Sequence, residues 1–97
     1  MTRYRMDDTV VDTDKATQQW EEDTRWDGRN RISVPTGSQW DHQKLYRSRK
    51  GRYYLEHWSQ YQASAEWVSN QEAARWLILN GHEVPDDLAG LVDEVTE

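Results

Sequence analysis

Three histidines, His42, His57 and His82, are the residues of this chain whose type most readily supports metal binding or acid–base chemistry. Such chemistry needs several ligands in one cluster, or a histidine held by a carboxylate. We expect His57 opposite Gln43 in a hairpin, so that the neighbouring His42 points to the other face and the two cannot share a metal. His82 follows a predicted helix end, where a cationic ring is favourable. The chain has no cysteine, and we predict no metal, no cofactor and structural or surface roles for all three histidines.

A nucleophilic site would need a serine, a histidine and a carboxylate that act together. Ser38, Asp41 and His42 lie within five residues of one another. A catalytic triad holds its members in mutual geometry, usually from separate elements, whereas neighbours on one extended segment point in different directions. The glycines of the chain are isolated and none opens a predicted helix, so no phosphate-cradling loop is indicated. We therefore predict that the protein is not an enzyme and has no catalytic residue.

Basic and aromatic residues alternate over 44–54, where five cations stand among three tyrosines. Proteins that bind single-stranded nucleic acid use this combination, because rings stack on bases while cations lie along the phosphates. The same rings would serve a protein contact, where Trp and Tyr are common hot spots. The candidate binding residues are Tyr46, Arg49, Lys50, Arg52, Tyr54 and Trp58.

The formal net charge of −6 is divided unevenly along the chain. Residues 1–27 carry four basic and eight acidic groups, residues 28–53 carry seven and one, and residues 54–97 carry one and nine. The acidic C-terminal part would repel a polyanion held within about 8 Å, the screening length at physiological salt.

We therefore predict a non-catalytic module that engages a protein partner, or a second copy of itself, through the aromatic and basic hairpin. An accessory nucleic-acid-binding protein that uses hairpin 44–54 stays open as the alternative. A third interpretation also stays open, in which the tyrosines support the core and the loop is only solvated.

The register of this hairpin can be predicted from charge. Pairing Arg47 with Arg52 would place like charges opposite each other, which is unfavourable. A shift by one residue instead pairs Leu45 with Leu55 and Tyr46 with Tyr54, and it places Lys44 opposite Glu56. This register leaves a three-residue loop, 49–51, with Gly51 at positive φ. The leucine pair marks one face as core, and the other face becomes an aromatic surface edged by charge.

A helix over 70–80 must support this hairpin. Ser69 and Glu72 form a capping box before it, and apolar residues then recur at the spacing of one helix face. Asn80 and Gly81 end it. A second short helix is expected over 86–94, opened by Val84-Pro85.

Together with the rest of the chain, these elements predict an α+β fold in a single globular domain over 16–95, preceded by a flexible acidic tail over 1–15. We expect an antiparallel β-meander of three to five strands over 17–68, with the C-terminal helix packed on one face and the second short helix beside it. Residues 16–26 alternate like a strand with Trp20 and Trp26 on one face, although a helix is the competing interpretation. Residues 31–34 predict a short strand.

Six Trp and five Tyr, with no Phe, indicate a core built from aromatic rings. We expect Trp40, Trp67 and Trp76 inside, and Trp58 and Trp20 on a contact surface. No apolar run approaches 18 residues, so no membrane span is expected, and the N-terminal residues lack the apolar part of a signal peptide. The lack of cysteine is compatible with a reducing compartment, and we predict a cytoplasmic protein.

Segments 36–60 and 72–88 carry the patterns TGSQW, LYRS, GRYYLE and EAARWL. In these patterns the chain resembles a group of small, mostly bacterial, uncharacterised proteins, and the resemblance covers residues 20–88. It implies a bacterial or mobile-element origin and one intact domain. It implies no activity, cofactor or site residue.

Overall fold

The computed structural model describes residues 2–91 of the chain. This part holds eight strands, one α-helix and two short 3-10 helices. In chain order they are β1 (Arg3–Met6), β2 (Thr9–Asp12), η1 (Thr13–Lys15), β3 (Gln18–Glu21), β4 (Thr24–Trp26), β5 (Arg31–Ser33), β6 (His42–Arg47), β7 (Tyr53–Trp58), β8 (Ala63–Val68), α1 (Asn70–Leu79) and η2 (Asp86–Leu91).

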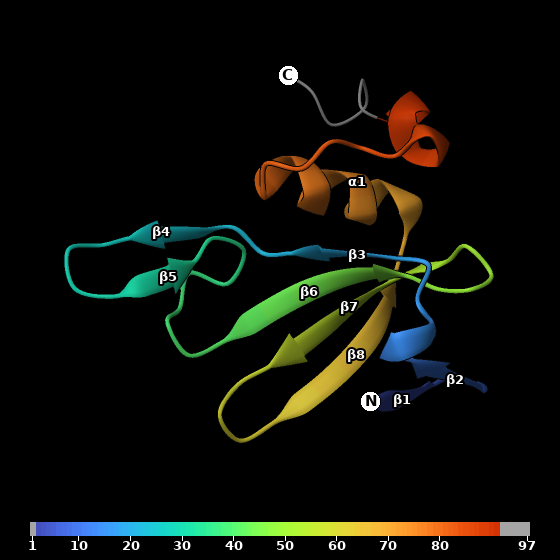
Figure 1. Ribbon diagram of the computed structural model, residues 1–97, viewed down its shortest axis with the longest axis horizontal. Helices are drawn as coiled ribbons and strands as arrows, with labels where there is room; N and C mark the ends of the chain where they lie inside the picture. The colour runs from blue at the N-terminus through green and yellow to red at the C-terminus, as the bar shows by residue number, and fades with distance from the viewer. Residues whose placement is uncertain (1, 92–97) are drawn as a thin grey trace.

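The central sheet is antiparallel and has the strand order β3-β6-β7-β8. Strands β6, β7 and β8 follow one another as a meander, and β3 joins β6 from the other side (Figure 1). Between β3 and β6 the chain forms a separate hairpin, β4–β5. The fold is therefore α+β with antiparallel sheets, as predicted. The meander itself consists of β6, β7 and β8, whereas the predicted range from residue 17 also supplies β3 and the separate β4–β5 hairpin.

The predicted register of the β6–β7 hairpin is also confirmed. Leu45 lies opposite Leu55, Tyr46 opposite Tyr54, and Lys44 opposite Glu56. Gly51 has φ +88°, a conformation that side chains disfavour and that the three-residue loop requires.

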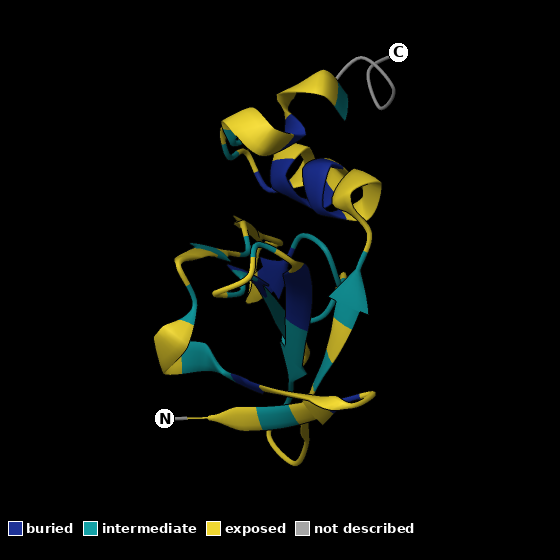
Figure 2. Ribbon diagram, turned by 90° about the vertical axis from the view of Figure 1, so that its right-hand side faces the viewer, coloured by how far each residue is buried: buried dark blue, intermediate teal, exposed yellow. Residues whose placement is uncertain are grey.

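Helix α1 begins at the predicted residue and ends at Leu79, one residue before the predicted end. It packs on one face of the sheet, where buried residues of the helix turn toward the strands (Figure 2). The Ser69 hydroxyl accepts the Glu72 amide hydrogen, and the Glu72 carboxylate accepts the Ser69 amide hydrogen, so the capping box is complete. The first core consists of buried residues from β6, β7, α1 and η2, namely Leu45, Tyr53, Leu55, Ala73, Ala74, Trp76, Leu77 and Leu88.

The other face of the sheet is covered by the β1–β2 hairpin, where the composition predicted a flexible tail over 1–15. Met6 and Val11 are buried there against Tyr46 and Tyr54 and form a second core, with Tyr4 packed beside them. Tyr4 and Met6 are two residues apart on β1, and Val11 lies opposite Tyr4, so all three can point to one face. The four aspartates around these residues make the composition of the segment polar, so that the composition does not reveal the short apolar stripe.

Residues 16–26 are extended, as predicted, but they form two strands of different sheets. The break is at Asp23, whose amide hydrogen is accepted by the Asn80 side chain at 2.8 Å. Trp20 consequently packs against the first core, at 6.1 Å from the Tyr53 ring centroid, while Trp26 is exposed. The expectation that both rings share one face was wrong, because a single strand does not span them.

Three further predictions have mixed outcomes. Trp76 is buried as expected and Trp67 is half-buried, but Trp40 is exposed because it follows β5 in a loop and not in the sheet. The second short helix is the 3-10 helix η2, and the predicted residues 92–94 lie outside the described residues. Within residues 2–91, no helix is both long and apolar enough to cross a membrane.

Candidate functional site

The six candidate binding residues occupy three different environments. Arg49, Lys50 and Arg52 are exposed at the β6–β7 loop, as a solvent-accessible site requires. Trp58 lies at the other end of β7, and a strand of this length separates it from the loop by roughly 17 Å. The remaining two, Tyr46 and Tyr54, are buried under the N-terminal hairpin, and their rings are not free to stack on a ligand.

The two buried tyrosines stack on each other with ring centroids 5.1 Å apart. The Tyr46 hydroxyl donates to the Glu56 carboxylate at 3.1 Å, and the Tyr4 hydroxyl donates to the same carboxylate at 2.6 Å. Burial, together with this carboxylate, raises the pKa of Tyr4 and Tyr46 well above the ordinary value of a phenol. The Tyr54 hydroxyl is buried as well, but it has no hydrogen-bond partner among residues 2–91.

Because only the Tyr46 hydroxyl has a hydrogen-bond partner within residues 2–91, the same substitution should affect stability differently at these two stacked residues. Tyr46→Phe should lower the free energy of unfolding by about 1–2 kcal/mol, because it removes a hydrogen bond to a charged group. Tyr54→Phe should leave stability unchanged or raise it by up to about 1 kcal/mol, because it removes an unsatisfied buried donor. Urea denaturation in a chloride buffer measures both, and an equal loss in the two variants would contradict the difference in hydrogen bonding.

The basic end of the hairpin gathers several predicted residues around one small cleft. Arg49, Lys50 and Tyr54 line it together with Trp67, and the guanidinium of Arg52 lies 3.9 Å from the Trp67 ring centroid. A cation at this distance over an indole is a favourable contact. Thus the structure brings four of the six candidate residues together at this end.

The opposite end of the sheet carries an exposed aromatic surface, which we call the aromatic end and define as Trp40, Trp58 and Tyr61. Trp40 is 64% exposed and Tyr61 is 87% exposed. Both rings line one groove of about 350 Å³, whose other lining residues are Asp41, Ser59 and Gln60. The loops β5–β6 and β7–β8 that carry them lie side by side at this groove.

Short-range hydrogen bonds fix the two loops of the aromatic end. The Ser38 hydroxyl accepts the amide hydrogens of Trp40 at 3.0 Å and Asp41 at 3.3 Å. In the other loop, the Ser59 hydroxyl accepts the Tyr61 amide hydrogen at 3.4 Å, and the Ser59 amide donates to the Gln62 carbonyl at 2.8 Å. The exposed rings therefore stand on backbone that is already ordered, which lowers the entropy lost on binding.

A carboxylate behind the aromatic end positions Trp58 through a histidine. Glu22, whose side chain is 10% exposed, accepts from His42 Nδ1 at 2.8 Å, from the Gln43 amide at 2.6 Å and from the Ser33 hydroxyl at 2.9 Å. The His42 ring in turn lies 5.6 Å from the Trp58 ring. His42 is thereby tied into the sheet, and Trp58 packs on it half-buried.

The other two histidines also have partners within the fold. The His57 ring contacts the side-chain amide of Gln43 at 3.1 Å and the Glu66 carboxylate at 3.0 Å. The His82 ring stacks on Trp76 and contacts the Glu21 carbonyl. Residues 2–91 hold no group of three or more His, Asp and Glu side chains that could bind one metal ion.

Sequence reasoning missed two residues of the aromatic end. The sequence patterns place Trp40 in the core, which the lack of Phe requires to be built from other rings, and they assign no role to Tyr61. The available signal was the Ser-rich turn chemistry on both sides, since Ser38 and Ser59 each precede an exposed ring by two residues. No family model, no curated protein and no solved structure matches this chain, so the functional argument rests on these residues.

Proposed function

We propose that this protein is a non-catalytic binding module that engages a protein partner through its aromatic end. The observation that carries the proposal is that two exposed rings, Trp40 and Tyr61, come from different loops and line one groove. Eight of the other nine Trp and Tyr residues are buried or half-buried, whereas these two rings, and Trp26 on a separate hairpin, are exposed to water. Trp and Tyr are the residues most enriched at binding hot spots.

The size of the surface agrees with a contact of this kind. Each ring can bury on the order of 150–250 Å², and Trp58 beside them adds a partly buried face. A standard interface buries about 800 Å² per partner, so the aromatic end would form the central part and the loops around it the rim. A second copy of the chain is one possible partner.

The chemistry of the groove favours a cationic or apolar segment of the partner. Asp41 lines the groove together with the two rings, and residues 54–97 carry nine acidic groups against one basic group. Arg and Lys side chains bind aromatic faces and carboxylates together. A partner segment that carries Arg or Lys beside an apolar residue would therefore satisfy both parts of the groove.

The alternative is an accessory nucleic-acid-binding protein that uses the basic hairpin 44–54. Arg49, Lys50 and Arg52 are exposed and support it. Stacking on Tyr46 and Tyr54, which that function would use, is blocked by their burial. We therefore rank it second.

Capture of partners from the host cell with and without nuclease separates the two functions. The wild-type protein should retain its partner after nuclease treatment. Trp40→Ala combined with Tyr61→Ala should weaken that partner about tenfold or more, because hot-spot rings cost at least about 2 kcal/mol when truncated. The affinity for the purified partner, or the dimer constant from sedimentation, gives the measurement.

Two control variants make this experiment specific. Trp26→Ala truncates an equally exposed ring on the β4–β5 hairpin and should leave binding unchanged. Arg49→Gln, Lys50→Gln and Arg52→Gln combined in one variant should also leave partner binding unchanged. Loss of the partner in the basic variant or on nuclease treatment, with binding retained in the Trp40/Tyr61 variant, would favour the nucleic-acid function instead.

A further inference from the structure

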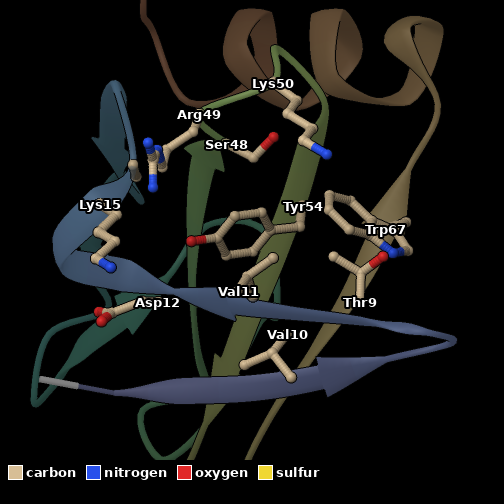
Figure 3. A pocket seen from close by; sticks show the side chains of 11 residues that line it. Thr9, Val10, Val11, Asp12, Lys15, Ser48, Arg49, Lys50, Tyr54 and Trp67 are labelled. Carbon is tan, nitrogen blue, oxygen red and sulfur yellow. The ribbon is translucent and has the colours of Figure 1, made fainter.

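A small cleft lies between the β1–β2 hairpin and the β6–β7 loop (Figure 3). In Figure 1 these segments lie at one end of the central sheet, and the β5–β6 and β7–β8 loops that carry the aromatic end lie at the other. Its volume is about 130 Å³, below the roughly 300–1,000 Å³ of a site for a drug-sized ligand. A space of this size fits one functional group and not a whole nucleotide. The residues that line it are Thr9, Val10, Val11, Asp12, Lys15, Ala16, Ser48, Arg49, Lys50, Tyr54 and Trp67.

Three cations surround the cleft, and they come from two separate parts of the chain. Lys15 belongs to η1, and Arg49 and Lys50 belong to the β6–β7 loop. All three are exposed, and none of them forms an ion pair within residues 2–91. Three cations that line one cleft without an ion pair within residues 2–91, in a chain whose net charge is −6, create a local positive potential.

The one carboxylate that lines the cleft, Asp12, is already engaged. Its Oδ1 accepts the Asp14 amide hydrogen at 3.0 Å, and its Oδ2 lies 3.5 Å from Arg3 Nε. Its side chain is only 9% exposed. The lining therefore carries three cations against a single, internally paired anion.

The floor of the cleft supplies a hydrogen-bond donor without an acceptor. Tyr54 is 1% exposed, and its buried hydroxyl has no hydrogen-bond partner in the part of the chain that the structure describes. In Figure 3 the hydroxyl lies on the side of the cleft where Lys15 and Arg49 are found. Burial raises the pKa of Tyr54 to about 12, so the hydroxyl keeps its proton at neutral pH and acts as a donor. A buried polar group without a partner is rare and points to a water or an ion that completes it.

We propose that this cleft binds a small oxyanion, such as a phosphate group, between Lys15, Arg49 and Lys50, with the Tyr54 hydroxyl as a neutral donor. Charge and hydrogen-bonding capacity agree, because the cations and the phenol have donors to offer and an oxyanion has only acceptors. Because the Tyr54 hydroxyl is buried, an oxyanion reaches it only when a side chain of the lining moves aside, and the exposed Lys15 and Arg49 side chains have no ion pair within residues 2–91 to hold them in place.

Titration with inorganic phosphate, in exchange for chloride at constant ionic strength, tests the proposal. Amide signals of residues 48–50 and the indole signal of Trp67 report binding by NMR. The wild-type protein should give saturable shifts. Arg49→Gln with Lys50→Gln should weaken binding about tenfold or more, and Tyr54→Phe should weaken it about three- to tenfold, because each removes a donor to a charged group.

The matched control is Arg29→Gln with Arg31→Gln, which removes the same charge from the β4–β5 hairpin. It should retain wild-type binding. A control variant that loses as much as the loop variant, or shifts that never saturate, would overturn the proposal. Phenyl phosphate distinguishes the source of the anion: tighter binding than inorganic phosphate indicates a phosphate carried on an apolar group, and equal binding indicates the free ion. A single-stranded oligonucleotide that binds tightly and is indifferent to Tyr54→Phe would replace the oxyanion site with a nucleic-acid surface.

Discussion

Leu77→Ala is expected to lower the free energy of unfolding by about 2–5 kcal/mol, the range for truncating a large buried aliphatic side chain. Leu77 is fully buried and lies in the first core, where α1 meets Leu45, Tyr53 and Leu55 of the sheet. Removing it leaves a cavity between the helix and the strands, which the rigid neighbours on both sides cannot fill. Urea denaturation monitored by tryptophan fluorescence measures the change.

Leu79→Ala is the matched control for this variant, because it makes the same chemical change two residues further along the same helix. Leu79 is exposed, and its truncation should change stability by no more than about 0.5 kcal/mol. Equal losses in the two variants would mean that α1 does not use this face against the sheet, and the layered description of the fold would be wrong.

The parts of the fold that follow from local sequence were predictable. The capping box at Ser69 and Glu72 and the stop at Gly81 lie within a few residues of the helix they delimit, so the boundaries of α1 follow from neighbouring residues. The β6–β7 register likewise follows from side chains that face each other across a short loop, with Gly51 at the turn. These features need no knowledge of what covers them.

The N-terminal hairpin could not be predicted in the same way, because its partners are far along the chain. Tyr4 donates to Glu56, which lies 52 residues away, and Met6 and Val11 are buried only because the outer face of the β6–β7 hairpin needs cover. A two-stranded hairpin is marginally stable alone. Its sequence is consequently dominated by surface aspartates, and composition alone makes it look like a tail.

The same cover explains the outcome at the candidate site. The sequence predicts the β6–β7 hairpin correctly, and Arg49, Lys50 and Arg52 are exposed at its loop. It assigned Tyr46 and Tyr54 to the same surface, because alternation shows which side chains share a face but not whether another element lies over that face. Trp40 shows the reverse error, since a large ring in a loop has no strand or helix to bury it.

Substitution of the buried methionine of the β1–β2 hairpin gives the second large expected effect. Met6→Ala should lower the free energy of unfolding by about 2–3 kcal/mol, near the lower end for a buried methionine, because the second core is small and lies under a two-stranded hairpin. Met6 is 5% exposed and packs in this core with Val11, Tyr46 and Tyr54. Urea denaturation gives the value, and faster hydrogen exchange of the amides in β1 and β2 should accompany it.

Val10→Ala is the control within the same hairpin, since Val10 is 63% exposed and its truncation should cost no more than about 0.5 kcal/mol. A flexible tail would make the two variants alike and both nearly neutral. That result would mean that the β1–β2 hairpin does not cover Tyr46 and Tyr54, so that their rings are accessible on the surface of the basic hairpin. Binding of nucleic acid by stacking on these rings would then become the leading function. A large loss for Met6 with none for Val10 instead keeps these tyrosines inside and leaves partner binding to the aromatic end.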